Sequence, residues 1–139
     1  MRNTPKVLYT GQTDTIGGRE NGFGRSSDGV LDIRFSAPGS MGIGTNPEQL
    51  LAAGWSASLA SAIALVALRR KFPLPGEVRI HAEVSLIFDL KVYAHMSRLT
   101  VALPGVERPT AEVLLEEAIE ICPISKAFRR ACDVTIELA

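Results

Sequence analysis

The chain has 139 residues, a length at which one domain with a single hydrophobic core is the expected organisation. Its 15 basic and 15 acidic residues cancel, which argues against a nucleic-acid partner and favours a small molecule or another protein. Two cysteines are too few for a disulfide framework, and the N-terminus MRNTPKVLYT lacks the apolar stretch of a secretory signal, so we expect a cytoplasmic protein.

Two segments near the N-terminus are rich in residues that favour strands. Residues 6–16 and 30–35 flank the glycine-rich segment GGRENGFGRSSDG, and this arrangement predicts a hairpin-like pair joined by a loop. The following segment, SAPGSMGIG, breaks the regular pattern before a helix begins.

A long helix is predicted from the segment TNPEQLLAAGWSASLASAIALVAL, residues 45–68. Asn46 can cap it, Pro47 suits its first position, and Gln49 completes a capping box. Leu50 to Leu68 carry no charge, but their alanines, serines and glycine are too weakly hydrophobic for a membrane span. A helix without a polar face needs protein around it, which favours a homodimer; Gly54, Ser58 and Ala62 would allow close approach.

The second half of the chain alternates between strand and helix patterns. Residues 77–88 and 92–103 alternate polar and apolar side chains, which predicts two antiparallel strands. A second helix is predicted from Thr110 as its N-cap to Ile121, followed by a short helical piece over 124–130 and a last strand, DVTIEL. This order indicates an α+β fold in a single domain spanning 1–139. His81 and His95 lack the spacing of metal ligands, so no metal site is predicted.

The residues that could take part in a reaction can also be explained by ordinary structural roles when only the sequence pattern is considered. Ser58 can be a small residue at a helix contact, its hydroxyl bonded to the carbonyl of residue 54. Cys122 precedes Pro123 and can sit at a helix N-cap, where a thiol becomes more acidic, or it can be a buried structural cysteine. Cys132 is predicted to lie about 12 to 15 Å from Cys122, too far for a disulfide, and is assigned to the core.

Four segments together resemble the organic hydroperoxide resistance proteins, a branch of the larger family that includes the osmotically induced protein C. They are GGR at 17–19, GTNPEQLLAAGWSAS at 44–58, ICPISKAFRR at 121–130 and the terminal DVTIEL. They follow the family order over nearly the whole chain. The resemblance implies an interwoven α+β homodimer with antiparallel sheets and a long central helix. It also implies a thiol peroxidase that reduces organic hydroperoxides to alcohols.

The resemblance further implies the roles of individual residues. Family members attack the peroxide with a cysteine of the long helix, and the alignment places Ser58 at that position. Cys122 matches the resolving cysteine, and Arg19 with Glu48 matches the activating pair. No bound cofactor is implied; lipoyl groups or small dithiols act as the external reductant. A second departure is Ile119, where relatives often carry histidine.

Helix geometry limits how these residues can meet. Ten residues of continuous helix span about 15 Å, so Arg19 cannot easily touch both Glu48 and position 58 within one straight helix. Either the helix breaks near Gly54, or a dimer combines residues of two chains in each site; we favour the dimer.

An apolar pocket is expected beside the site because the alkyl part of an organic hydroperoxide must leave water. Five side chains near the motifs are candidates, each with ordinary core packing as its alternative: Phe23, Met41, Ile43, Trp55 and Ile124.

Position 58 allows three interpretations, because a serine hydroxyl has no sulfenic-type oxidation state and cannot take the peroxide oxygen. Ser58 can be an engineered replacement of the attacking cysteine that holds a peroxidase in a reduced or substrate-bound state. The chain can instead be a natural, non-catalytic relative that binds an apolar or oxidised small molecule, or Cys122 can attack alone. We favour the first, because Arg19, Glu48 and Cys122 are all present.

Overall fold

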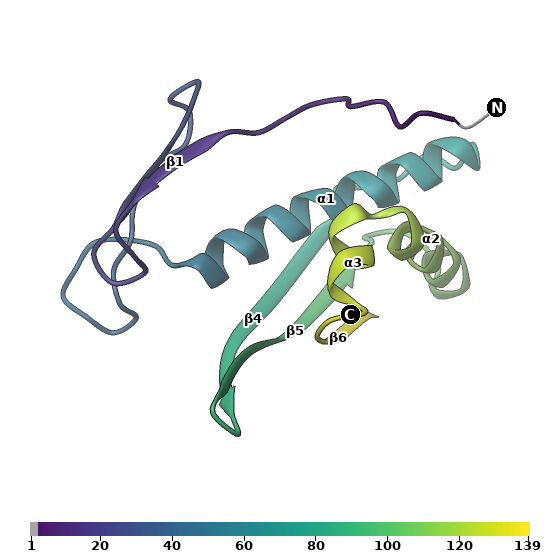
Figure 1. The fold of residues 1–139 in the computed structure, drawn as a ribbon. Helices are drawn as coiled ribbons and strands as arrows, with labels where there is room; N and C mark the ends of the chain where they lie inside the picture. The colour runs from purple at the N-terminus through teal and green to yellow at the C-terminus, as the bar shows by residue number, and fades with distance from the viewer. Residues whose placement is uncertain (1–2) are drawn as a thin grey trace. The chain divides into compact units, whose positions relative to one another are not determined.

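The computed structural model describes residues 3–139, which divide into two compact units, one up to Pro47 and one over Glu48–Ala139. Figure 1 shows the order of the elements along the chain. The assignment of residues 1–139 to a single domain stays a prediction.

The N-terminal unit is a three-stranded antiparallel sheet rather than a pair of strands. Its strands are β1 (Thr13–Ile16), β2 (Phe23–Ser26) and β3 (Asp32–Arg34), in the order β1-β2-β3. The prediction of a loop over 17–29 was therefore wrong, because β2 lies within it. Gly17 and Gly29, with φ of 79° and 73°, make the turns on either side of β2. Glycines thus permit the reversals here without preventing the strand between them.

The C-terminal unit begins with α1 (Pro47–Arg69), an unbroken helix of 23 residues. The predicted start at Pro47 is confirmed, and the alternative of a helix break near Gly54 is wrong. The hairpin β4 (Arg79–Asp89) and β5 (Val92–Ala102) follows, with the antiparallel pairing that the alternation predicts. Their two-residue turn, Leu90 and Lys91, has positive φ at both positions, 45° and 69°.

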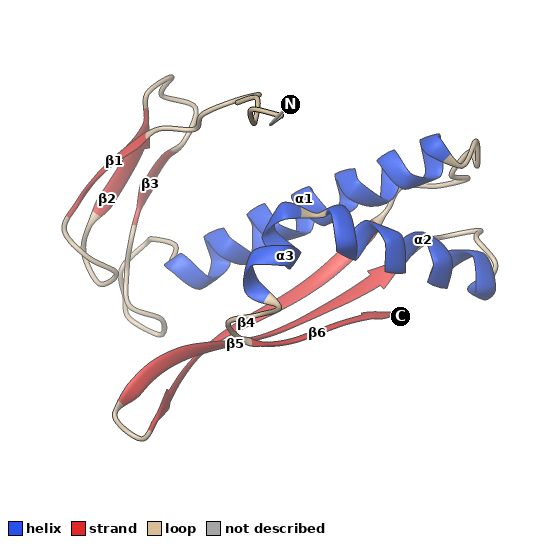
Figure 2. Cartoon of the chain, turned by 45° about the vertical axis from the view of Figure 1, so that its right-hand side comes forward, coloured by secondary structure: helices blue, strands red, loops and turns tan. Residues whose placement is uncertain are grey.

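The chain then forms α2 (Arg108–Ile121), α3 (Pro123–Phe128) and β6 (Asp133–Leu138). Because the two helices carry the chain back across the sheet, β6 pairs parallel to β5, and the sheet β4-β5-β6 is mixed (Figure 2). The predicted N-cap at Thr110 was wrong: α2 begins at Arg108, with Glu107 as its N-cap and Pro109 in the first turn. A proline fits there because the first-turn N–H groups lack intrahelical acceptors.

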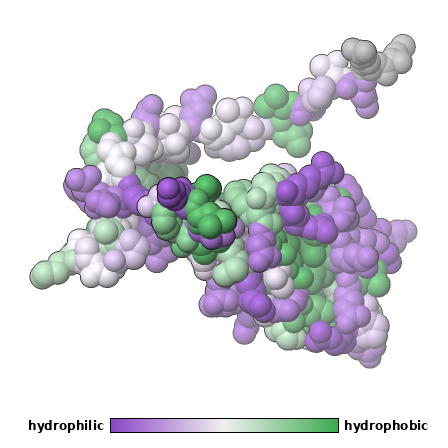
Figure 3. Space-filling view, turned by 60° about the horizontal axis from the view of Figure 1, so that its bottom comes forward, coloured by the Kyte–Doolittle hydropathy of each residue, from purple (hydrophilic) through white to green (hydrophobic). Residues whose placement is uncertain are grey.

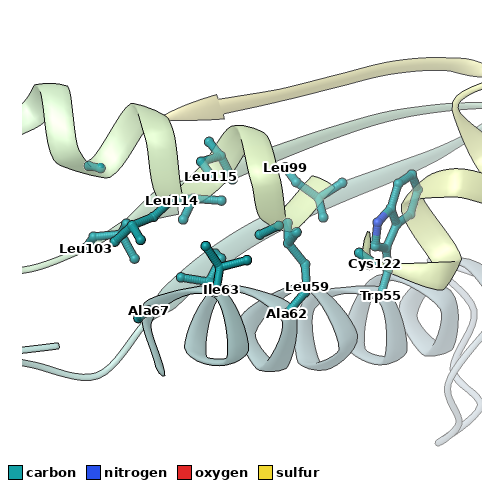
Figure 4. Packing of buried hydrophobic residues seen from close by; sticks show 14 residues of the cluster. Trp55, Leu59, Ala62, Ile63, Ala67, Leu99, Leu103, Leu114, Leu115 and Cys122 are labelled. Carbon is teal, nitrogen blue, oxygen red and sulfur yellow. The ribbon is translucent and has the colours of Figure 1, made fainter. Parts of the chain in front are cut away.

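The hydrophobic core of the C-terminal unit lies on one side of α1. Trp55, Leu59 and Ile63 point from this side toward the other helices and β5 and are completely buried (Figure 4). Leu99 of β5 and Leu114 of α2 complete the centre of the cluster, with at most 1% of their surface exposed. The i, i+4 spacing of the α1 residues places them on one stripe, so the helix buries a single face.

The opposite face of α1 is open to solvent and uncharged; we call it the open face of α1. Its members are mostly small and all lie between the second and last turns: Ala53, Gly54, Ala57, Ser61, Ala64, Leu65 and Leu68. Leu68 is 74% exposed. Figure 3 shows hydrophobic residues at the molecular surface, bordered by hydrophilic ones. The described residues of the C-terminal unit therefore do not cover this helix on every side. By length and composition α1 could cross a membrane, but the core helix of a soluble protein meets the same criteria.

Candidate functional site

Ser58 and Cys122 lie side by side although 64 residues separate them in the sequence. Ser58 is half-buried in the middle of α1, and its Oγ is 3.6 Å from Sγ of Cys122. Cys122 is completely buried and occupies the junction of α2 and α3. The two residues are thus within the range of a hydrogen bond that involves sulfur, and either group can be the donor.

Cys122 has an extended backbone, with φ of −68° and ψ of 116°, between two helices. Its N–H donates to the carbonyl of Ala118 and ends α2, while its carbonyl accepts the first bond of α3 from Lys126. Pro123 takes the first position of α3, which confirms the predicted N-cap at Cys122. The thiol makes no capping hydrogen bond. The backbone is therefore fixed by both helices, and the side chain is left facing Ser58.

A second contact between α1 and α3 lies one turn away. The indole Nε1–H of Trp55 donates to Ser125 Oγ at 2.9 Å, and both side chains are completely buried. The Trp55 ring also packs against Phe128, with centroids 5.2 Å apart and a tilt of 35°. The interpretation of Trp55 as a core residue is confirmed; its role in a substrate pocket stays a prediction.

Glu48 has an unexpected partner in His95 of β5. The imidazole Nε2 lies 3.2 Å from the carboxylate Oε1, and the side chains of Glu48 and His95 are 11% and 31% exposed. Glu48 lies in the first turn of α1, where the helix dipole favours a negative charge. The carboxylate is therefore held from two sides, by the helix that carries it and by the sheet.

The remaining predicted site residues are distributed over both units of the chain. Arg19 is half-buried in the turn between β1 and β2, and its pairing with Glu48 stays a prediction. Phe23, Met41 and Ile43 are exposed residues of the N-terminal unit, and Ile124 is half-buried in the first turn of α3. The contribution of these four residues to an apolar pocket also stays a prediction. Cys132 is half-buried just before β6.

Sequence reasoning missed two members of these contacts, His95 and Ser125. For Ser125 a signal exists in the spacing: it follows Cys122 by three residues, just as Trp55 precedes Ser58 by three. Residues three apart lie on one helix face, so the two motifs present matching pairs. His95 carries no such signal, because its contact with Glu48 depends on how the sheet packs against α1.

Comparison with known proteins decides the family. Residues 38–137 match the family model of the OsmC-like proteins. The chain belongs to the OsmC-like family. It is 41% identical to the organic hydroperoxide resistance protein of Xanthomonas axonopodis pv. citri, over the full length of both chains. It is 37% identical to the organic hydroperoxide resistance protein OhrA of Bacillus subtilis, with 95% of this chain and 96% of that protein covered.

Solved structures of OsmC-like proteins have the same fold. An organic hydroperoxide resistance protein from Legionella pneumophila superposes with a TM-score of 0.88 at 38% identity, covering 96% of this chain and 99% of that one. OhrB of Bacillus subtilis gives a TM-score of 0.88 at 36% identity, with 96% and 100% covered. The predicted α+β fold and the predicted family are therefore confirmed.

Proposed function

We propose that this chain has the scaffold of a thiol peroxidase for organic hydroperoxides, with Ser58 at the position of the attacking cysteine. The names of its relatives support a role in organic hydroperoxide resistance. The observation that carries the finer proposal is the 3.6 Å contact between Ser58 Oγ and Cys122 Sγ. A cysteine at position 58 would have a second thiol beside it, as a two-thiol reaction requires.

The reaction would proceed in three steps in a chain with cysteine at position 58. Its thiolate attacks the distal peroxide oxygen, the O–O bond breaks, and the alkoxide takes a proton to leave as an alcohol. The resulting sulfenic acid condenses with the Cys122 thiol to a disulfide and water. A dithiol such as a reduced lipoyl group then restores both thiols by exchange. We propose Arg19 and Glu48 as the residues that stabilise the thiolate and orient the peroxide.

With Ser58 in place, the first step has no acceptor for the oxygen, so we propose that the present chain does not turn over peroxide. Attack by Cys122 alone is disfavoured because this residue is completely buried. A thiol that is closed off from solvent is a poor first nucleophile.

We also propose that the chain works as a homodimer in a reducing compartment. The open face of α1 supports this, because an uncharged strip on a core helix is unusual on the surface of a monomer. A dimer would also allow Arg19 and Glu48 to belong to sites that combine two chains.

The test is peroxide turnover by the chain beside its Ser58→Cys variant, with cumene hydroperoxide as substrate and dihydrolipoamide as reductant. We expect turnover only in the Ser58→Cys variant, with a disulfide between positions 58 and 122 detected by mass spectrometry. Ser58→Cys combined with Cys122→Ser should form the sulfenic acid without the disulfide, and Ser58→Cys with Cys132→Ser should behave as Ser58→Cys alone. Turnover by the unmodified chain would contradict the proposal.

The second candidate function is binding without catalysis. It is favoured by the serine itself, which leaves a chain of this family without its attacking thiol. Thermal denaturation in the presence of cumyl alcohol and cumene hydroperoxide tests it, because a ligand that binds only the folded state raises the midpoint. If Ser58→Cys is also inactive and these ligands raise the midpoint, the binding function replaces the peroxidase scaffold.

A further inference from the structure

Helices α1 and α3 are joined by two contacts that repeat at the same spacing. Trp55 and Ser58 are three residues apart on α1, and Ser125 and Cys122 are three residues apart at α3. Trp55 bonds to Ser125, and Ser58 contacts Cys122. Because residues three apart are neighbours on a helix surface, the two contacts lie in adjacent turns. Any slide of α3 along α1 that disturbs one of them must disturb the other.

The two contacts differ in strength. The bond between Trp55 Nε1 and Ser125 Oγ is short, 2.9 Å, and fully shielded from water, whereas the Ser58 to Cys122 contact is 3.6 Å and partly buried. An indole has one polar hydrogen and no acceptor, so the Trp55 side chain loses its only hydrogen bond if α3 moves away. Leaving a buried donor unpaired is costly. Packing of the Trp55 ring on Phe128 opposes rotation of the same helix.

We infer that the Trp55–Ser125 hydrogen bond is a clamp that positions Cys122 for its reaction with residue 58. This inference rests on the proposed function, because it concerns the second step of that reaction. Trp55 and Ser125 act as positioning residues: neither reacts, and each acts through the placement of Cys122. The clamp fixes α3 at Ser125, one turn from the thiol, where α3 is only six residues long and contributes little stability of its own.

The step that depends on this placement is disulfide formation. The Cys122 sulfur attacks the sulfenic sulfur at position 58, the S–S bond forms, and the S–O bond breaks. The hydroxide leaves as water with the proton of the thiol, the sulfenic sulfur is reduced and the thiol sulfur is oxidised. The final bond is about 2.05 Å long, so the present 3.6 Å separation of the two side-chain atoms leaves only a short approach. Losing the clamp should slow this step without changing the first attack.

The experiment uses the full chain with Ser58→Cys, oxidised by one equivalent of cumene hydroperoxide. Consumption of peroxide reports the first step, and trapping of the sulfenic acid with dimedone against time reports the second. We expect Ser125→Ala and Trp55→Phe, each added to Ser58→Cys, to slow disulfide formation about tenfold, the effect of one lost buried hydrogen bond. In Ser125→Ala, which changes no candidate pocket residue, the rate of peroxide consumption should stay within about twofold.

Two controls separate the clamp from a general loss of packing. Ser97→Ala removes another buried serine hydroxyl of the same unit, on β5, and should leave both steps unchanged. Trp55→Phe combined with Ser125→Ala removes both ends of one bond, so the double variant should be no slower than the worse single one. If the double variant forms the disulfide more slowly by the product of the two single effects, the two residues act independently and the clamp is wrong.

Hydrogen exchange of the Trp55 indole tests the clamp without any reaction, so it also applies to variants that react poorly. Trp55 is the single tryptophan of the chain, so its indole N–H gives one resolved signal in the unmodified protein. We expect this hydrogen to exchange slowly with solvent and to exchange at least tenfold faster in Ser125→Ala.

The outcomes distinguish the two proposals. If Ser58→Cys forms its disulfide equally fast with and without Ser125→Ala, the clamp is wrong and the peroxidase scaffold stands. Fast exchange of the indole hydrogen in the unmodified chain also overturns the clamp. If Ser58→Cys forms no sulfenic acid at all, the proposed function fails, and the clamp fails with it.

Discussion

At the scale of single residues, the hydroxyl of Ser97 is a buried polar group that the described fold leaves without a hydrogen bond. It lies in the middle of β5, is 3% exposed, and its Oγ has no hydrogen-bond partner among the described residues. A buried hydroxyl without a partner loses its bonds to water and gains nothing in return. Of the two buried serines among the described residues, Ser125 therefore accepts a hydrogen bond from Trp55 and Ser97 costs stability.

We predict that Ser97→Ala leaves the free energy of unfolding unchanged or raises it by up to about 1 kcal/mol, because an unpaired polar group is removed from the core. Ser125→Ala should lower it by about 1 to 3 kcal/mol, because the indole donor of Trp55 loses its acceptor. Urea denaturation of both variants, followed by circular dichroism, measures the difference. Equal losses in the two variants would show that the hydrogen bond to Trp55 adds nothing to stability.

The pair of Glu48 and His95 gives a second prediction at this scale. We expect His95→Leu to lower the free energy of unfolding by about 1 kcal/mol, because a nearly buried carboxylate loses a hydrogen-bonding neighbour. His95→Gln keeps an N–H donor at a similar reach and should recover most of the loss. Chemical denaturation of the three proteins at neutral pH is the measurement. If the Gln and Leu variants are equally weakened, the imidazole acts through packing rather than through its bond to Glu48.

At the scale of elements, an ion pair ties the end of α1 to α2. The guanidinium of Arg70 makes two bonds to the carboxylate of Glu117, one of them 3.0 Å long from Nε to Oε2. The hydrogen bond from Arg70, with its charge, holds the pKa of Glu117 below its ordinary value. A carboxyl whose pKa is lowered by folding stabilises the fold above the pKa of the unfolded chain. That contribution is lost as pH falls through the pKa of the folded state.

We therefore predict that Glu117→Gln lowers the midpoint of thermal unfolding slightly at pH 7. The difference should shrink as the pH falls below about 4.5, the ordinary pKa of the carboxyl, and disappear once the pH is below the lowered pKa of the folded state. Added salt should shrink it as well, because both partners are exposed. Glu116→Gln removes a neighbouring exposed charge from the same helix and is the matched control. A difference that persists in acid would contradict this account of the pair.

The elements also show which sequence patterns were sufficient to predict the secondary structure. The helix α1, the hairpin β4–β5 and the strand β6 are strongly patterned and were predicted within a few residues. β2 was missed because glycines on both sides suggested a continuous loop. Of the site, the pairing of residues 58 and 122 followed from the resemblance, and the structure supplies its distance. The contacts of Ser125 and His95 depend on how separate elements pack, which local patterns do not encode.

At the scale of the whole molecule, the open face of α1 is the feature that one chain leaves unexplained. Seven uncharged residues line it, and it lies on the helix that also forms the centre of the core. Small side chains such as those of Ala57, Ser61 and Ala64 allow two helices to pack closely, and Leu65 and Leu68 add apolar area. A second copy of the chain provides the same uncharged surface, so a twofold pairing is self-complementary.

We predict that the chain is a dimer at micromolar concentration and that Ala64→Glu converts it to a monomer, because pairing would bury two like charges at the twofold contact. Ala127→Glu makes the same change at an exposed position of α3 and should leave the dimer intact. Sedimentation equilibrium of the three proteins gives their masses directly. In the Ser58→Cys background, Ala64→Glu should also reduce peroxide turnover if each site combines residues of two chains. A monomeric unmodified chain, or a dimer that survives Ala64→Glu, would exclude the open face of α1 as the interface, and the uncharged helix would then need another partner.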